Sequence, residues 1–266
     1  MTFIVPIVAA EPELQAGAAM LAERLKLPLH QAETEQAPFV LELTRDGLQL
    51  RWTTQPKMQP LTLDYTRGAQ AWRQKLGGGK QEAVVRAIGL GHNVRPSVLD
   101  ATAGLGRDGM MLAHAGCNVY FLERHPGVHA LLDHAIHQFQ EAHAAEHWSS
   151  KRLHMLPAGS LLEAAPLPNH IQSIQPDAIY LDPMFPEREK SAAVKKDMQF
   201  LQALVGPDLD ADGLLAVALN LATYRVVVKR PNKAPFLAGQ TPSAQVPSKK
   251  HRFDIYIKKA YPKQAV

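Results

Sequence analysis

The feature that most constrains the fold is the alternation of short apolar strands and helices from about residue 76 onward. A helix is expected near 108–115, and Pro126 is well placed in the first turn of a long helix. This spacing predicts an α/β fold, with a mostly parallel sheet covered by helices on both faces. We expect its strands at 97–100, 118–123, 152–156, 177–182, 225–229 and 251–258.

The N-terminal segment has a different pattern. Alternating apolar residues at 39–44 and 48–52 flank Arg45-Asp46-Gly47, which predicts a β-hairpin, and residues 60–65 are expected to add a third strand. We therefore divide the chain into a small mixed α/β N-terminal domain at 1–75 and a larger domain at 76–266.

Composition limits the setting in which the chain works. Hydrophobic residues make up 46% of it, which is enough for a sizeable core, and its single cysteine, Cys117, excludes an intrachain disulfide. The start lacks a basic n-region and no apolar run reaches the length of a membrane span, so we expect a cytoplasmic protein without a membrane partner. The net charge of +4 is compatible with a polyanionic partner such as RNA.

A glycine-rich turn follows the first of these strands. Asp100 ends the strand, Gly104 and Gly106 would let the backbone approach a ligand, and the next helix offers free N–H groups. With Gly109 the spacing is G-x-G-x-x-G, and Glu123 lies 19 residues past Gly104, as suits ribose hydroxyls. These features alone fit a nicotinamide enzyme equally well.

The position of Asp100 favours S-adenosylmethionine instead. In dinucleotide-binding folds the first glycine follows the strand almost at once, whereas here three residues separate Asp100 from Gly104. A carboxylate at this point binds the amino end of a methionine moiety and would repel the phosphates of a dinucleotide.

A second motif, Asp182-Pro183-Met184-Phe185-Pro186, follows another apolar strand. The Asp182 carboxylate and the Pro183 carbonyl can both accept hydrogen bonds from an NH2 group, and Phe185 offers a face for base stacking, worth about 1–3 kcal/mol per base. Acceptors of this kind orient the lone pair of an exocyclic amine toward a methyl donor. The motif predicts amino methylation of a nucleic-acid base.

The chain resembles the ribosomal RNA small subunit methyltransferase J family, whose members methylate guanine N2 in 16S rRNA. The resemblance covers about residues 70–256 and is carried by the strings at 76–82, 98–108, 122–124, 180–186, 204–215, 225–231 and 250–256. It implies a Rossmann-like class I methyltransferase sheet and the small ribosomal subunit as partner. It also implies cofactor contacts at Arg107, Asp108, Glu123, Arg124, Gly159, Ser160 and Asp182.

Two departures from related patterns matter for the site. The family tends to have two serines where this chain has Gly159-Ser160, so a contact at Gly159 would be through the backbone. Met184 stands where the broader amino-methyltransferase tetrad has a second proline, which leaves the target base less fixed by the motif alone.

Basic and histidine-rich segments complete the set of candidates. We expect four residues near strand ends to contact RNA phosphates: Lys229, Arg230, Lys250 and Arg252. Ligands in mostly parallel sheets bind at the carboxyl ends of the strands, so we expect the chemistry just after Asp100, Glu123 and Asp182. His143-Ala-Ala-Glu-His147 matches a zinc-peptidase pattern, but we expect it on a helix away from these strand ends, and therefore expect no metal.

Three other functions remain open at this point. They are an amino-methyltransferase acting on adenine N6 or on DNA, a nicotinamide oxidoreductase, and a non-catalytic RNA-binding assembly factor. The intact Asp182–Phe185 loop counts against the last of these.

Overall fold

The computed structural model describes residues 4–30, 37–66, 82–91, 94–163, 168–184 and 196–262, and these residues form two sheets. The smaller sheet has the order β1-β2-β3-β4, with β1 parallel to β2 and the other pairs antiparallel. A 3-10 turn (Pro12–Leu14) and α1 (Gln15–Leu25) connect β1 to the hairpin. The strands are β1 (Ile7–Ala9), β2 (Phe39–Thr44), β3 (Gly47–Trp52) and β4 (Leu61–Thr62).

The larger sheet has seven strands in the order β10-β11-β9-β8-β5-β6-β7. The five strands from β9 to β7 are parallel, whereas β11 is antiparallel to β9 and β10 is antiparallel to β11. The strands are β5 (Ser97–Asp100), β6 (Asn118–Phe121), β7 (Leu153–Met155), β8 (Ala178–Leu181), β9 (Arg225–Pro231), β10 (Ala244–Pro247) and β11 (His251–Ile257).

Both faces of this sheet are buried, because alternate residues of the central strands enter two different apolar cores. Val98 and Val227 belong to the first core, whereas their neighbours Leu99, Val226 and Val228 belong to the second. The first core is covered by α3 (Ala83–Ile88), α4 (Arg107–Ala115), α5 (Pro126–Glu141), α6 (Trp148–Arg152) and α8 (Lys196–Val205). The second is covered by α7 (Asn169–Gln172), α9 (Ala211–Leu221) and the 3-10 turn Leu237–Gly239.

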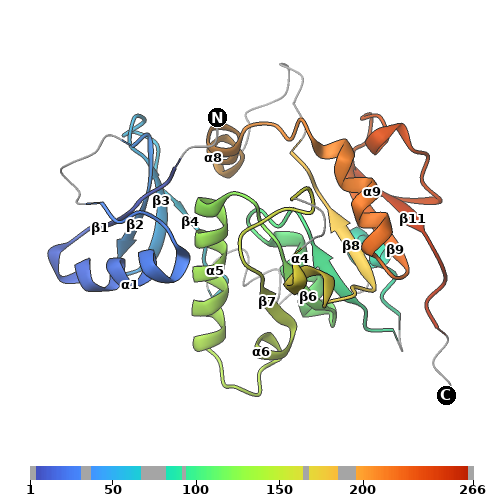
Figure 1. Cartoon of the computed structure of the whole chain (residues 1–266), viewed down its shortest axis with the longest axis horizontal. Helices are drawn as coiled ribbons and strands as arrows, with labels where there is room; N and C mark the ends of the chain where they lie inside the picture. The colour runs from blue at the N-terminus through green and yellow to red at the C-terminus, as the bar shows by residue number, and fades with distance from the viewer. Residues whose placement is uncertain are drawn as a thin grey trace.

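The N-terminal sheet shares the first core. Leu50 and Tyr65 belong to the same buried cluster as Leu132 and Phe139 of α5, and α5 stands between the two sheets in Figure 1. Apolar packing is thus continuous from the small sheet to the glycine loop that precedes α4. The predicted domain boundary at 75/76 lies outside the described residues.

The structure confirms the predicted α/β class and its parallel-rich sheet. Each expected strand is present, although the third N-terminal one shrinks to Leu61–Thr62. The sequence analysis missed β1 and β10. Both are edge strands: β1 has only three residues, and β10 is mostly exposed and pairs only with β11, so neither shows a long apolar alternation.

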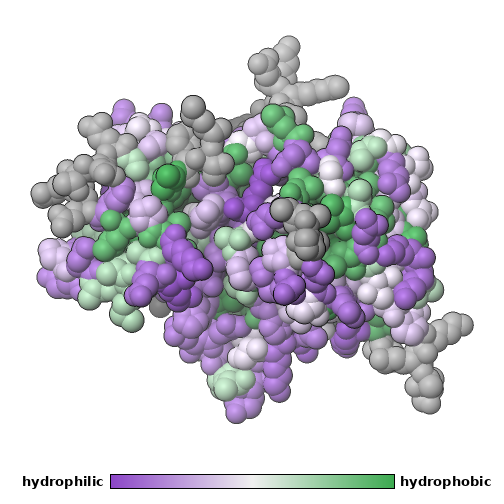
Figure 2. Space-filling model, in the orientation of Figure 1, coloured by the Kyte–Doolittle hydropathy of each residue, from purple (hydrophilic) through white to green (hydrophobic). Residues whose placement is uncertain are grey.

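On the face seen in Figure 2, apolar residues form separate patches among hydrophilic ones, and hydrophilic residues predominate around α5 and α6. None of the helices in the described part of the chain combines the length and apolar character that crossing a membrane requires.

Candidate active site

The carboxyl ends of neighbouring parallel strands bring three acidic residues to one edge of the large sheet. Asp100 is in register with Phe121 on one side and with Tyr180 on the other, so Glu123 and Asp182 follow close to the same level. Asp100 and Glu123 are buried, at 1% and 7% exposure, whereas the Asp182 side chain is 39% exposed. The predicted convergence of strand ends is therefore present, and Asp182 is the member that solvent reaches.

Glu123 joins the loops that follow β5 and β6. One carboxylate oxygen accepts from the Gly104 N–H at 2.8 Å, and the other accepts from the His125 N–H at 2.7 Å. Burial raises the pKa of Glu123, and these two N–H donors oppose the rise. The carboxylate is thus fixed against the glycine loop, and its remaining lone pairs are available for hydroxyl donors.

The three glycines of the motif, two in the loop and Gly109 in α4, are required for different physical reasons. Gly104 has a φ of +52°, and within the described part of the chain an added Cβ would find only the Thr102 carbonyl, at 4.0 Å. A Cβ on Gly106 would lie 2.6 Å from Leu132 Cδ1, and one on Gly109 would lie 2.3 Å from Phe121 Cε1. Leu132 fills the Cβ side of Gly106, so a ligand contact at Gly106 would be through the backbone and stays a prediction. Of the three glycines, Gly104 is the one whose Cβ side is open with respect to the described residues.

Asp100 has an unfilled hydrogen-bonding site. Its Oδ1 is buried and finds no hydrogen-bond partner within the described part of the chain. Burial raises the pKa of this carboxyl well above its ordinary value, and the charges of Asp108 and Asp182 add to the effect. A cationic donor would relieve both conditions, so the site fits the ammonium group of a methionine moiety. The open side of Gly104 and the Glu123 carboxylate fit the rest of S-adenosylmethionine.

Lys229 lies between two carboxylates at this edge. Its Nζ is 2.8 Å from Asp108 Oδ2 and 2.8 Å from Asp182 Oδ2, and the Tyr180 hydroxyl donates to Asp108 Oδ2 at 2.6 Å. Burial lowers the pKa of Lys229, but the two carboxylates outweigh it and the net shift is upward. The ammonium is therefore held in its charged form. His251 of β11 faces the same cluster, and its pKa is lowered by burial and by Lys229.

The loop after β8 is held by groups from the loop after β5 and the loop after α8. The Asp182 N–H donates to Thr102 Oγ1 at 2.6 Å, and the Met184 N–H donates to Asp208 Oδ2 at 2.6 Å. Asp208 also pairs with Arg124. Thr102 and Asp208 were missed in the sequence analysis, although both lie in strings that carry the family resemblance. Phe185 lies outside the described residues.

The remaining predicted cofactor residues flank this centre. Arg107 pairs with Asp197, and Arg124 pairs with Asp208 and Asp210, so both arginines already have acidic partners. The Gly159 N–H donates to the Glu123 carbonyl at 3.0 Å, which places the 159–160 turn beside Glu123. Ser160 Oγ accepts from the Leu162 N–H at 3.1 Å.

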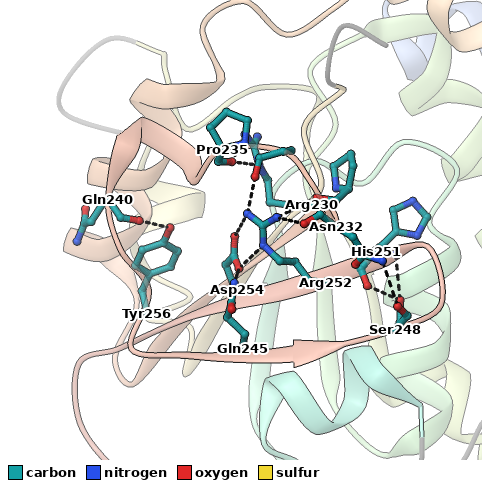
Figure 3. Close-up of polar contacts among 12 residues, drawn as sticks. Arg230, Asn232, Pro235, Gln240, Gln245, Ser248, His251, Arg252, Asp254 and Tyr256 are labelled. Carbon is teal, nitrogen blue, oxygen red and sulfur yellow. Dashed lines mark hydrogen bonds and ion pairs between the residues drawn. The ribbon is translucent and has the colours of Figure 1, made fainter. Parts of the chain in front are cut away.

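Two of the four predicted RNA contacts are structural. Arg230 is 2% exposed and donates to the Pro235 carbonyl at 2.6 Å. Arg252 is 9% exposed and donates to the carbonyls of Pro231, Asn232 and Ala234, and it pairs with the fully buried Asp254 (Figure 3). The prediction that Arg230 and Arg252 contact phosphates is wrong, because both guanidinium groups shape the 231–236 loop from inside.

The other two predicted RNA contacts differ from each other. The Lys229 ammonium is taken up by the carboxylates of the site, so it is turned inward rather than toward a phosphate. Lys250 is exposed, as are Lys233 and Lys249. Since His251 pairs with Pro231 at the carboxyl end of β9, these three lysines lie near the same sheet edge as Asp182. We call Lys233, Lys249 and Lys250 the basic lip.

The zinc-like histidine pattern forms a different structure. The rings of His143 and His147 stack with centroids 4.2 Å apart, and His143 Nδ1 lies 2.7 Å from the Phe139 carbonyl. Within the described ranges, no group of three or more His, Cys, Asp or Glu side chains is arranged to hold a metal ion.

Comparison with known proteins gives consistent matches over most of the chain. The family profile described as "Putative SAM-dependent methyltransferase" matches residues 20–258. Ribosomal RNA small subunit methyltransferase J from Idiomarina loihiensis is 46% identical over 263 residues, covering 98% of this chain and 97% of the relative. The protein of the same name from Colwellia psychrerythraea is 48% identical over 237 residues, covering 88% and 85%.

A solved structure agrees with these sequence matches. The SAM-dependent methyltransferase from Neisseria gonorrhoeae superposes with a TM-score of 0.68 at 28% identity, covering 97% of this chain and 99% of that one. The large sheet is thus the Rossmann-like sheet of S-adenosylmethionine-dependent methyltransferases. The chain belongs to the ribosomal RNA small subunit methyltransferase J family of S-adenosylmethionine-dependent methyltransferases.

Proposed function

We propose that this protein transfers a methyl group from S-adenosylmethionine to the exocyclic N2 amine of a guanosine in 16S rRNA. The observation that carries the proposal is Asp182, a half-exposed carboxylate at the carboxyl end of β8, held by Thr102 and Lys229 beside the open Gly104 loop. Family membership removes the nicotinamide oxidoreductase alternative. The relatives' name supplies the substrate class, small-subunit rRNA.

The residues around the glycine loop would hold the cofactor. Asp100 would accept from the methionine ammonium, Gly104 would contact it through its open side, and Glu123 would accept from the ribose hydroxyls. Gly159 and Ser160 would lie near the adenine, and Arg107, Asp108 and Arg124 would lie around the bound cofactor. When bound there, S-adenosylmethionine supplies an electrophilic methyl group.

Asp182 and Pro183 would hold the target amine. An exocyclic amine is a weak nucleophile because its lone pair is delocalised into the ring, so acceptors that bind its protons and orient that lone pair lower the barrier. Orientation of reacting groups is worth up to about 7–11 kcal/mol. The Asp182 carboxylate supplies an acceptor, the Pro183 carbonyl supplies a second, and Phe185 would stack on the base.

The basic lip would receive the RNA backbone. Its three lysines are exposed, whereas Arg230 and Arg252 beneath them hold the loop carbonyls in place. Exposed ammonium groups beside a base-binding site can pair with phosphates and fix the position of the strand. Of the four predicted RNA contacts, Lys250 is therefore the one whose exposed ammonium can pair with a phosphate.

Because the proposed substrate is 16S rRNA, we infer that the protein works in the cytoplasm. We assign residues 1–75 to a small N-terminal domain and 76–266 to the methyltransferase domain, which is supported by a four-stranded sheet ending at Thr62 and a seven-stranded sheet starting at Ser97.

The test is transfer of a labelled methyl group from S-adenosylmethionine to small-subunit rRNA, or to subunits from a strain lacking the gene, followed by nucleoside mass spectrometry. We expect N2-methylguanosine, and its loss in Asp182→Ala with cofactor binding retained. Asp46→Ala is the matched control, because Asp46 is an exposed carboxylate in the N-terminal hairpin turn. A product methylated at adenine N6, or label in DNA alone, would refute the target. Cofactor binding with no transfer to any of these substrates would favour the assembly-factor alternative.

A further inference from the structure

Lys229 is the point at which three elements of the site meet. Its ammonium contacts Asp108 in the first turn of α4 and Asp182 after β8, each at 2.8 Å. The Lys229 side chain is 20% exposed and the Asp108 side chain 22%, so this contact is largely shielded from solvent, whereas the Asp182 side chain is 39% exposed. A shielded ammonium between two carboxylates fixes their separation more firmly than exposed ion pairs do.

The register of the sheet explains why these residues meet. β9 is parallel to β8 with Leu181 opposite Val228, so the next residues, Asp182 and Lys229, are level with each other. Two positions earlier, Tyr180 and Val227 both belong to the first core, which α4 covers. Because side chains alternate along a strand, Asp182 and Lys229 also lie on the α4 side.

The charge balance at this point depends on Lys229. Burial alone would raise the pKa of Asp108, but the ion pair with Lys229 brings it below its ordinary value. Burial leaves the pKa of Asp182 above its ordinary value, although Lys229 opposes this. Among the described residues, the charged and titratable groups that face Asp182 are Lys229 of β9, Asp108 of α4, His251 of β11, Asp100 of β5 and Tyr180 of β8.

We propose that Lys229 is a positioning residue for the target base: its ammonium holds Oδ2 of Asp182 and leaves Oδ1 directed to accept from the substrate amine. This inference rests on the proposed function, in which Asp182 binds that amine. Among the residues that the structure describes, no donor contacts Oδ1 of Asp182, and this side chain is more exposed than Asp108 or Lys229. Lys229 therefore acts through Asp182 and not on the RNA phosphates.

The experiment compares Lys229→Met with Lys229→Arg, which keeps the cation. The rate of methyl transfer is measured against pH at saturating cofactor, together with KM for the RNA. Loss of a neighbouring opposite charge raises a carboxyl pKa by roughly 1–3 units. We expect the acidic limb of the Lys229→Met profile to move upward by that amount and its rate to recover at high pH, whereas Lys229→Arg keeps the wild-type limb.

A second readout does not need turnover. Carbon-13 NMR of labelled aspartate carboxyls follows the titration of Asp182 in the protein without cofactor, with its signal assigned by Asp182→Asn. We expect the Asp182 titration to move upward in Lys229→Met. In the double variant Lys229→Met with Asp108→Asn, the repelling carboxylate is also gone, so both the titration and the acidic limb should return toward the wild-type position.

The outcomes separate this inference from the function on which it rests. If the wild-type protein makes no N2-methylguanosine, the proposed function fails, while the carboxyl titration still reports on the Lys229–Asp182 pair. If Lys229→Met lowers the rate by one factor at every pH and the Asp182 titration does not move, Lys229 is only structural and the inference is overturned. Melting temperatures of all variants check that each is folded.

Discussion

Replacing Gly104 with alanine tests whether the cofactor approaches the open side of the glycine loop. Among the described residues, an added Cβ would meet no atom closer than the Thr102 carbonyl at 4.0 Å, so this part of the chain leaves room for it. The φ of +52° at this position is left-handed and disfavours alanine. A loss of cofactor affinity in Gly104→Ala that exceeds the cost of this backbone strain would therefore come from contact between the new methyl group and the ligand on the open side.

The backbone strain in Gly104→Ala lowers the folding stability whether or not a ligand is bound. A left-handed conformation costs a residue with a Cβ about 1–2 kcal/mol. Alanine also restricts the unfolded chain, which returns about 0.4–1 kcal/mol. The net loss of folding stability is then about 1 kcal/mol, which lowers the melting temperature by roughly 2–4 °C in a protein of this size. A methyl group forced against a bound ligand adds about 1–3 kcal/mol to the binding free energy.

Gly239→Ala is the matched control. Gly239 has a φ of +65°, no atom of the residues that the structure describes lies within 4 Å of an added Cβ, and the position is outside the proposed cofactor contacts. Both variants should lose about the same folding stability in a thermal melt. In calorimetric titration with S-adenosylmethionine, Gly104→Ala should bind at least about five-fold more weakly, which corresponds to about 1 kcal/mol, and Gly239→Ala should bind like the wild type. Equal affinity of both variants would show that the cofactor does not contact Gly104.

Three further predictions concern residues that support the site. The Tyr65 hydroxyl donates to the carbonyl of the residue before Gly106; Tyr65→Phe should therefore lose about 1 kcal/mol of folding stability in a denaturant melt, with unchanged far-UV dichroism. Arg252→Ala should lose about 3–5 kcal/mol of folding stability, because it removes the ion-pair partner of the buried Asp254 carboxylate. Replacement of the exposed Lys250 by alanine should change folding stability by no more than about 0.5 kcal/mol. Equal losses would contradict the assignment of Arg252 as structural. Burial raises the pKa of the Cys117 thiol to about 12, so an aromatic disulfide reagent at neutral pH should react with it only after unfolding.

Much of the fold was predictable because the central strands are buried on both faces. Strands such as Ala178–Leu181 are short apolar runs followed by an acidic residue, and parallel pairing alone brings those acidic residues to one edge. The strand positions therefore also predicted where Asp100, Glu123 and Asp182 would meet. The edge strand β10 carries no such signal, because its residues are mostly exposed and its pairing depends on β11.

The contacts made by side chains at the site were harder to predict, because they depend on partners distant in sequence. Gly106 fits the nucleotide-binding spacing as well as Gly104 does, and only Leu132 of α5 and Tyr65 of the N-terminal segment show that its side is filled. The role of Asp208, which fixes Met184 and Arg124, likewise needs the loop after α8 to fold back on the loop after β8.

The basic residues show most clearly why sequence patterns misjudge charge. Lys229, Arg230 and Arg252 cluster near strand ends, as phosphate-binding residues do, yet a strand turns successive side chains to opposite faces. Lys229 therefore enters the acidic side of the site, while its neighbour Arg230 enters the 231–236 loop and binds a carbonyl. A buried cation is tolerated only with acceptors around it, and both residues have them. Of the four residues that the pattern selected, Lys250 is exposed, and with Lys233 and Lys249 it offers charge to a polyanion at this edge of the sheet.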